Sequence, residues 1–317
     1  MAVAEFTNKI LQGDCLEVMQ RFETGSIDMI LTSPPYDNLR NYKGYVFPFE
    51  AIARELYRVV KDGGVVVWVV GDATIDGSET GTSFKQALFF KEIGFNLHDT
   101  MIFKKRNPIP QIYRRRYNNE FEYMFVLSKG LVATHSPLMV DCLHAGLELN
   151  GTTYKNYSKH DQKRGKMAKP VKDQKIKGNI WEYVVGKNLE DQEAKGHPAP
   201  FPCELARDHI YSWSNEGDLI LDPMCGSGTT CKVARQLGRN FIGIDISQEY
   251  CEIARNRLAT TNDLQAQLPL EELTNRCSGR RSTAAEPERY PLSSSRLIPR
   301  VVPVQKSFDF PQDGVRG

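Results

Sequence analysis

The sequence predicts an α/β fold in which helices cover a doubly wound sheet. Apolar runs of strand length alternate with segments of helical periodicity, which is the pattern of successive β-α-β units. The run VVVWVV at Val65–Val70 is almost entirely β-branched, as in a strand buried on both faces of a parallel sheet. A glycine-rich turn at Gly226–Gly228 joins a short strand to a helix, and folds of this class bind ligands at such turns.

The first half of the chain contains four predicted strands and two predicted helices. The strands cover residues 26–31, 65–70, 98–105 and 121–129, and the helices cover residues 48–60 and 82–93. The first helix has apolar residues at helical spacing, and Lys61–Gly64 predicts its end. The second helix is expected to begin with Thr82 or Ser83 as its N-cap, because hydroxyl side chains accept hydrogen bonds from the first free backbone N–H groups.

The second half returns to the same alternation after an irregular stretch. Helices are predicted at residues 203–214, 229–238 and 248–259, and strands at residues 218–222 and 240–247. From residue 263 to residue 317, Pro, Ser and Arg are spread through the chain without a sustained period. This composition predicts a mostly disordered tail.

Composition excludes several classes of protein. The 317 residues are 40% hydrophobic and 25% charged, as in ordinary globular domains. No apolar run approaches the roughly 20 residues of a membrane-spanning helix, and the N-terminus shows no signal-peptide pattern. The 7 cysteines form no CxxC pair, which favours reduced thiols in a cytoplasmic protein and predicts no metal site. A secreted disulfide scaffold, a membrane protein and a zinc ribbon are therefore not expected.

Positive charge is concentrated in one region of the chain. The net charge is only +2, but residues 104–187 contain 17 Lys and Arg against 7 Asp and Glu. Periodicity fades between residues 130 and 180, so this part is interpreted as a basic, loop-rich insert. Such an insert suits a polyanion as partner. The alternative is a basic loop that only faces solvent.

The first motif with chemical meaning surrounds the glycine-rich turn. Asp222 ends the predicted strand before the turn, and Asp245 ends the next strand along the chain. Glycines allow a backbone to approach a ligand closely, and a helix N-terminus offers free N–H groups. A carboxylate at the end of the second strand suits a ribose diol. The pattern predicts a nucleoside-type cofactor, and the alternative is an ordinary turn between a strand and a helix.

The second motif is Thr32-Ser33-Pro34-Pro35-Tyr36, at the end of the first predicted strand. Two prolines fix the backbone, so that carbonyl groups project in set directions. The Ser33 hydroxyl and the Pro34 carbonyl can accept hydrogen bonds from an amino group, and the Tyr36 ring can stack on a flat heterocycle. The motif predicts a receptor for a planar group that bears an amine. A turn that is merely stiffened by proline is the alternative.

Together these motifs resemble those of the β-class DNA amino-methyltransferases, the N4-cytosine and N6-adenine group that uses S-adenosyl-L-methionine. TSPPY resembles the family's catalytic motif, DPMCGSGTT its cofactor loop, and FIGIDIS the strand that follows. The catalytic motif precedes the cofactor loop by about 190 residues, and this order is what marks the β class. The resemblance covers residues 8–260. It implies the Rossmann-like, doubly wound, mostly parallel sheet of a class I methyltransferase.

The resemblance also implies a division of the chain and a mechanism. Residues 1–129 form the catalytic half, residues 130–180 a target-recognition insert, and residues 181–262 the cofactor-binding half, with the tail outside the family. The target base leaves the duplex and is held against Tyr36. Its amine then attacks the sulfonium methyl group directly, without a covalent enzyme intermediate. Methylation of carbon 5 of cytosine would need a cysteine nucleophile, and Cys203 is interpreted as part of a helix start.

Site residues follow from the motifs and from the resemblance. The catalytic residues are Ser33, Pro34, Pro35 and Tyr36. The predicted cofactor-binding residues are Asp14, Phe201, Asp222, Pro223, Gly226, Ser227, Gly228, Thr229 and Asp245. Candidate contacts to DNA phosphates are Arg114, Arg115, Arg116, Lys163, Arg164, Lys166 and Lys169. For Asp14 the alternative is a helix N-cap, for Phe201 a core aromatic ring, and for Trp181 a core position is favoured over a base contact.

The residue before the two prolines bears on the target base. Serine there is typical of N4-cytosine enzymes in the family, so Ser33 favours cytosine, with N6 of adenine as the alternative. An RNA or protein amide methyltransferase and a catalytically inactive DNA-binding module are weaker alternatives. The expected partner is double-stranded DNA, and a cognate restriction endonuclease is a candidate second partner. No membrane is involved, and the sequence does not indicate an oligomeric state.

Overall fold

The structure is a computed structural model of the whole chain. It describes residues 2–35, 47–108, 116–143, 153–154, 165–166, 172–185 and 202–260, with the backbone alone at 153–154 and 165–166. The chain divides into one unit at Met1–Leu273 and a second at Thr274–Gly317. The second unit lies outside the described residues, as does the whole predicted tail.

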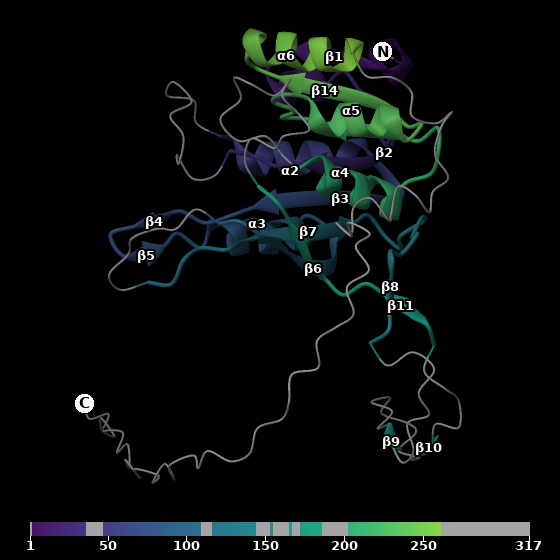
Figure 1. The fold of residues 1–317 in the computed structure, drawn as a ribbon. Coiled ribbons are helices and arrows are strands. Elements are labelled where there is room, and N and C mark those ends of the chain that lie inside the picture. Colours follow the sequence, from purple (N-terminus) through teal and green to yellow (C-terminus); the bar gives the residue numbers. More distant parts are fainter. Residues whose placement is uncertain are drawn as a thin grey trace, which may run out of the picture. The chain divides into compact units, whose positions relative to one another are not determined.

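An eight-stranded sheet forms the centre of the first unit (Figure 1). In spatial order its strands are β1 (Lys9–Gln12), β14 (Asn240–Asp245), β13 (Leu219–Asp222), β2 (Ile27–Thr32), β3 (Val60–Val70), β7 (Phe121–Ser128), β6 (Asn96–Lys105) and β12 (Ile180–Tyr183). Neighbouring strands are parallel except for β7, which is antiparallel to both β3 and β6. The predicted doubly wound, mostly parallel sheet is confirmed.

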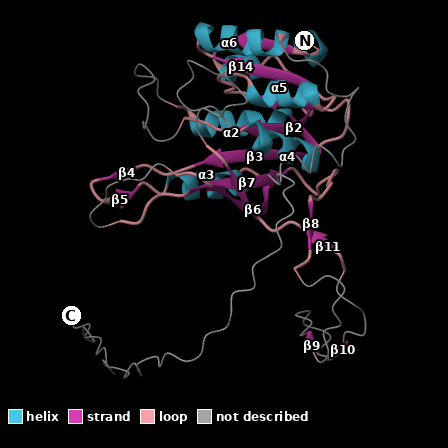
Figure 2. Ribbon diagram, in the orientation of Figure 1, coloured by secondary structure: helices cyan, strands magenta, loops and turns pink. Residues whose placement is uncertain are grey.

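Helices cover both faces of this sheet (Figure 2). One face packs against α4 (Cys203–Trp213), α5 (Thr229–Gln236) and α6 (Gln248–Ala259), and the other against α1 (Cys15–Met19), α2 (Phe49–Val59) and α3 (Thr82–Glu92). Alternate residues of a strand therefore enter two separate hydrophobic cores. In β13, Ile220 enters the core under α4–α6, while Leu219 and Leu221 enter the core under α1–α3.

Strand β3 begins earlier than its sequence predicts. Helix α2 does end at Val59, but the chain passes directly from there into the strand. The expected stop at Lys61–Gly64 lies within β3, at an irregularity in its pairing with β2. Gly63 adopts a φ of +81°, and a Cβ at Gly64 would lie 2.7 Å from the Asp28 carbonyl oxygen. The glycines thus permit an irregular start of the strand rather than a loop.

The start of α3 also differs from expectation. Its N-cap is Gly81, with a φ of +65°, so the predicted N-cap at Thr82 or Ser83 was wrong. The acceptor comes instead from Asp72, which accepts hydrogen bonds from the Ser83 backbone N–H at 2.9 Å and from the Thr80 hydroxyl at 3.3 Å. A residue eleven positions earlier therefore caps this helix, a contact that local sequence patterns do not reveal.

Several short strands were not predicted. The edge strands β1 and β12 each contain four residues, and β12 places Trp181 in a core, as favoured from the sequence. In the insert, β8 (Met139–Asp141) pairs with β11 (Gln174–Ile176), and β9 (Thr153–Tyr154) with β10 (Gly165–Lys166). After β3, β4 (Thr74–Ile75) and β5 (Ser78–Glu79) form a small hairpin. No helix in the described part of the chain is both long and apolar enough to cross a membrane.

Candidate active site

Strands β13 and β2 lie side by side in the sheet, although about 190 residues separate them in the sequence. They run parallel, with Ile220 opposite Met29 and Leu221 opposite Ile30. After β13 the chain continues through α5 to β14 on one side, and after β2 it continues through α2 to β3 on the other. Ligands of doubly wound sheets bind at the carboxyl ends of strands that diverge in this way.

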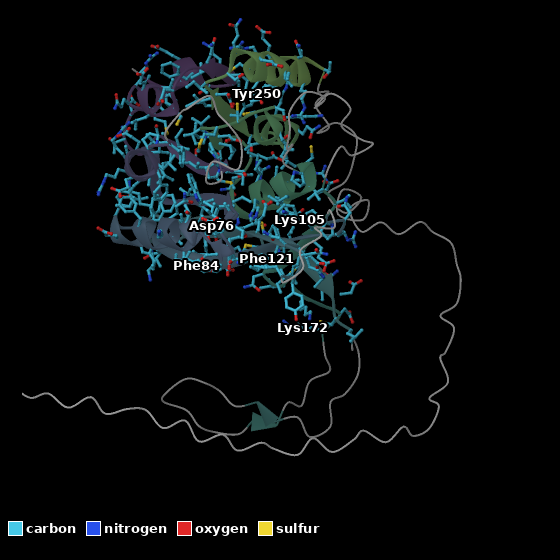
Figure 3. The ribbon with its side chains drawn as sticks, turned by 90° about the vertical axis from the view of Figure 1, so that its left-hand side faces the viewer. Asp76, Phe84, Lys105, Phe121, Lys172 and Tyr250 are labelled. Atoms are coloured by element: carbon cyan, nitrogen blue, oxygen red, sulfur yellow. The ribbon has the colours of Figure 1, made fainter. Side chains whose placement is uncertain are left out.

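The carboxyl edge of the sheet brings several loops together. Figure 3 views the molecule from the left-hand side of Figure 1, the side on which the β4–β5 hairpin follows β3. The view labels Asp76 in the hairpin turn, Phe121 at the start of the antiparallel β7, and Tyr250 in the first turn of α6. Because parallel strands end at the same edge, the turns after β2, β13 and β14 share this side of the sheet.

Asp222 occupies the last position of β13 and is buried. Its Oδ1 atom accepts hydrogen bonds from the Thr32 hydroxyl at 2.8 Å and from the Met224 backbone N–H at 3.2 Å, and the Thr230 side chain also bonds to the carboxylate. Burial nevertheless dominates and raises the pKa of Asp222 to about 6. The carboxyl group therefore accepts hydrogen bonds both from the end of β2 and from the turn and helix that follow β13.

Asp245 ends β14 and organises the glycine-rich turn from the neighbouring strand. Its Oδ2 accepts a hydrogen bond from the Gly226 backbone N–H at 2.9 Å, and its Oδ1 accepts one from the Ser247 backbone N–H at 2.8 Å. Burial raises the pKa of Asp245 above its ordinary value, and these two hydrogen bonds oppose that rise. One carboxylate thus fixes the turn after β13 relative to the turn after β14.

Gly228 has a packing role in addition to the ligand approach predicted for it. Its φ of +76° lies in the left-handed region, and a Cβ there would lie 2.7 Å from the Ala254 Cβ of α6. The absence of a side chain therefore lets the start of α5 pack against α6. The close approach of a ligand to this backbone stays a prediction.

Arg257 of α6 is a site-supporting residue that sequence reasoning missed. It is only 1% exposed, and its Nη1 donates hydrogen bonds to the Ser227 carbonyl, to the Ser227 hydroxyl at 2.9 Å and to the Thr229 hydroxyl at 3.2 Å. The guanidinium group thus attaches α6 to the glycine-rich turn. An arginine on an amphipathic helix normally faces solvent, so the sequence alone gave no signal for this role.

The predicted catalytic motif begins where β2 ends. Thr32 is buried and is the last residue of the strand, Pro34 is buried, and Ser33 and Pro35 are partly exposed. The hydrogen bond from Thr32 to Asp222 joins this segment to the start of the glycine-rich turn. The structure therefore brings the two predicted motifs together at one point of the sheet. Tyr36 lies outside the described residues.

Asp14 is the N-cap of α1. Its Oδ1 accepts hydrogen bonds from the backbone N–H groups of Leu16 at 2.8 Å and Glu17 at 3.4 Å. The preceding Gly13 donates its backbone N–H to the Asp245 carbonyl oxygen at 3.0 Å. The loop is thus placed beside the end of β14. The capping role is observed, and the predicted cofactor contact remains a prediction.

Several predicted residues cannot be placed in the site. Phe201, Arg114, Arg115, Lys163, Arg164 and Lys169 lie outside the described residues, and Lys166 is described only as backbone in β10. Arg116 is described: its guanidinium donates hydrogen bonds to the Gly77 carbonyl at 2.6 Å and to Glu79 at 3.3 Å. It braces the β4–β5 hairpin, and a DNA contact from it remains a prediction. Within the described ranges, no group of three or more His, Cys, Asp or Glu side chains could hold a metal ion.

The strand order, the antiparallel β7 and the two loops that meet at the strand divergence define the fold of a class I methyltransferase. Residues 27–256 match the family model N6_N4_Mtase, described as DNA methylase. The chain belongs to this DNA methylase family.

Individual relatives agree with this assignment. The orphan methyltransferase M.BamHII of Bacillus amyloliquefaciens is 52% identical over 237 residues, which are 74% of this chain and 89% of the relative. The structure of PvuII DNA methyltransferase (cytosine-N4-specific) has a TM-score of 0.60 at 20% identity, covering 84% of this chain and 89% of its own. The structure of the M1.HpyAVI–SAM complex has a TM-score of 0.50 at 25% identity, covering 81% and 100%.

Proposed function

We propose that this chain is a site-specific DNA methyltransferase. It transfers a methyl group from S-adenosyl-L-methionine to the exocyclic amine of a flipped base, with N4 of cytosine favoured and N6 of adenine as the alternative. The observation that carries the proposal is the meeting of the Ser33–Pro35 segment with the Asp222–Gly228 turn at the carboxyl edge of adjacent strands. Membership in the DNA methylase family supports DNA as the substrate.

The donor and acceptor groups around the turn suit this cofactor. Each carboxylate oxygen of Asp245 accepts one backbone N–H, which leaves further lone pairs for the two hydroxyl groups of a ribose. The Asp14 loop is held beside the end of the same strand. We assign cofactor contacts to Asp14, Phe201, Asp222, Pro223, Gly226, Ser227, Gly228, Thr229 and Asp245. When bound, S-adenosyl-L-methionine supplies a methyl group on a positively charged sulfur.

The proposed catalytic segment, Ser33–Tyr36, binds the exocyclic amine of the target base. The Ser33 hydroxyl and the Pro34 carbonyl accept hydrogen bonds from its N–H groups, and this draws the nitrogen towards tetrahedral geometry. The ring of Tyr36 stacks on the base and holds it in place after it leaves the duplex. The residues orient and polarise the amine, while no side chain becomes covalently attached to it.

The proposed preference for cytosine depends on one residue and can be tested directly. Ser33 before the two prolines favours cytosine. Purified protein is incubated with unmethylated DNA and the cofactor, and the DNA is digested to nucleosides for mass spectrometry. N4-methyl-2′-deoxycytidine is the expected product. N6-methyl-2′-deoxyadenosine would identify the alternative base, and the absence of both, with the cofactor bound, would contradict amine methylation of DNA.

The insert is proposed to contact DNA. Its described part contains the β8–β11 ribbon, in which Lys175 is exposed together with the apolar side chains of Met139 and Ile176, and the exposed Lys172 lies just before β11. Two short strands with an exposed apolar surface have little core of their own, which suits a segment that binds a partner. The ribbon is anchored near the end of α4, where the Ser136 N–H donates to the Ser212 carbonyl at 2.8 Å.

A further inference from the structure

One side-chain hydrogen bond connects the two halves of the candidate site. The hydroxyl of Thr32, at the end of β2, donates to Oδ1 of Asp222, at the end of β13, over 2.8 Å. Thr32 is 1% exposed and Asp222 is 5% exposed. Water therefore competes little for either group, and a hydrogen bond to a buried carboxylate is among the stronger neutral-to-charged contacts in proteins.

This bond lies just beyond the last backbone pair between β2 and β13. The backbone pairing of β2 with β13 ends at Ile30 and Leu221, whereas its pairing with β3 continues as far as Thr32 and Trp68. At its last residue, β2 is thus joined to β3 by backbone pairing and to β13 through a side chain. The bond lies where the strands diverge, and it replaces the next step of the ladder.

Thr32 and Asp222 are also the last residues before the two functional segments. Ser33 follows Thr32 directly, and Pro223 begins the glycine-rich turn directly after Asp222. Asp222 keeps two other donors in the turn and its helix, the Met224 backbone N–H and the Thr230 side chain. Loss of the Thr32 hydroxyl would therefore leave the turn after β13 attached to Asp222, while the end of β2 would lose its connection to it.

We propose that Thr32 is a positioning residue that sets the distance between the amine-binding segment and the cofactor turn. This inference rests on the proposed methyl transfer. Thr32 is 1% exposed and is assigned no contact to the base or the cofactor, so we infer that it acts through Asp222. A displacement of about 1 Å between reacting groups can cost roughly a hundredfold in rate. The bond should therefore affect turnover far more than cofactor affinity.

Three variants separate the hydroxyl from the shape of the side chain. Thr32→Val keeps the shape and removes the hydroxyl, while Thr32→Ser and Thr32→Ala both lose the methyl group and differ from each other only in the hydroxyl. We expect kcat to fall by about tenfold to a hundredfold in Thr32→Val and Thr32→Ala, and by less than about threefold in Thr32→Ser. The Kd of S-adenosyl-L-homocysteine, measured by calorimetry, should change by less than about threefold in all of them.

A matched control removes a different buried hydroxyl. Ser128 ends β7 at the opposite edge of the sheet and donates to the Gly130 carbonyl at 2.9 Å, so Ser128→Ala should leave kcat unchanged. If Thr32→Val does not fold, the Ser and Ala variants still carry the comparison. Equal kcat values in Thr32→Ser and Thr32→Ala would overturn the proposal, and so would a loss that falls entirely on the Kd. Failure of the proposed function is distinct, because the wild type would then methylate no DNA.

Discussion

The carboxyl group of Asp222 makes the stability of the fold depend on pH. Its pKa rises from 3.8 to about 6 because it is buried. Between these values the folded protein holds a proton that the unfolded chain has released, so its contribution to stability is greatest below pH 4 and falls as the pH rises through 6. The loss amounts to about 3 kcal/mol, since one pKa unit corresponds to about 1.4 kcal/mol.

Replacing this residue should remove that dependence. In Asp222→Asn, the amide oxygen can still accept the Thr32 hydrogen bond, but no charge forms at neutral pH. The stability of the variant relative to the wild type should increase by about 2.4 kcal/mol between pH 4 and pH 7. Urea unfolding at both pH values measures the difference. An identical difference between the two proteins at pH 4 and pH 7 would show that the carboxyl group titrates normally.

The pKa of His209 is shifted downwards, so this residue makes the stability depend on pH in the opposite direction. It is completely buried, with Nε2 3.2 Å from the Met124 sulfur, and burial, aided by Lys177, lowers its pKa from 6.5 to about 3. Between pH 6.5 and pH 3 the unfolded chain binds a proton at this residue, whereas the folded protein does not. The stabilising contribution is therefore complete above pH 6.5 and is lost progressively as the pH falls towards 3.

A leucine at this position should make the protein less sensitive to acid. The Nδ1 atom of His209 has no hydrogen-bond partner among the described residues, so His209→Leu sacrifices no bond there. Between pH 7 and pH 4.5 the wild type should lose about 2 to 3 kcal/mol of stability through this group, and the variant should not. Guanidinium unfolding of both proteins across this range gives the slopes. Parallel slopes would mean that the histidine accepts a proton in the folded state.

At the scale of elements, periodicity located the central strands and, in the described part of the chain, every helix longer than seven residues. It did so because buried positions recur at fixed intervals along them. The sequence did not reveal β1 or β12, since four-residue edge strands provide too few alternations to be distinguished from loops. The cap of α3 and the irregular start of β3 depend on Asp72 and on the Asp28 carbonyl, which are distant in sequence from the residues they affect. Tertiary contacts of this kind leave no local pattern.

In the candidate site, too, local sequence patterns could be read from the sequence, whereas tertiary contacts could not. Asp222 and Asp245 could be predicted as site residues because a carboxylate at the end of a strand beside a glycine-rich turn has a recognisable spacing. Arg257 and the Thr32–Asp222 bond could not, because one is an arginine buried on a helix and the other joins residues 190 positions apart. A motif indicates which residues meet a ligand, whereas the residues that hold the motif in place appear only in the fold.

The charge of the insert leads to a prediction for DNA binding. Lys163, Arg164, Lys166 and Lys169 are expected to contact phosphates. Replacement of all four with Ala should weaken binding to every DNA sequence and reduce the salt dependence by up to about 0.9 log unit per lost contact. Binding titrations at several salt concentrations measure the slope, and the affinity for S-adenosyl-L-homocysteine should not change.

Two exposed basic residues outside the insert provide the control for the salt dependence of DNA binding. Arg21 follows α1 and Lys91 lies in the last turn of α3, both far in sequence from the insert. Arg21→Ala with Lys91→Ala should leave the salt slope unaltered. An unchanged slope in the fourfold variant as well would mean that the insert faces solvent, and DNA recognition would then belong to the loops that flank the catalytic segment.

For the molecule as a whole, cofactor binding should stabilise the entire first unit. The proposed contacts come from β13, β14 and the loop after β1, so they join three neighbouring strands on one side of the strand divergence. At a concentration one hundred times its Kd, a ligand that binds only the folded state adds about 2.7 kcal/mol of stability. S-adenosyl-L-homocysteine should raise the Tm of the wild type accordingly.

Asp245→Ala tests where this stabilisation originates. Removal of the carboxylate should weaken ligand binding by about 1 to 3 kcal/mol, so the same ligand concentration should give about two thirds of the stabilisation or less. Thermal unfolding with and without ligand supplies the comparison. Asp62→Ala, which removes an acid whose side chain is 92% exposed, is the control and should retain the full shift. An undiminished shift in Asp245→Ala would place the nucleoside elsewhere.

The adjacency of β2 and β13 also has a consequence during synthesis of the chain. The strand with the amine-binding segment leaves the ribosome about 190 residues before the strand with the cofactor turn. At roughly 5 to 20 residues per second, the interval is about 10 to 40 seconds. For most of that time β2 has β3 as a neighbour on one edge, while its other edge stays unpaired until β13 is made. The candidate site therefore cannot assemble on a nascent chain until almost the whole folded unit has been translated.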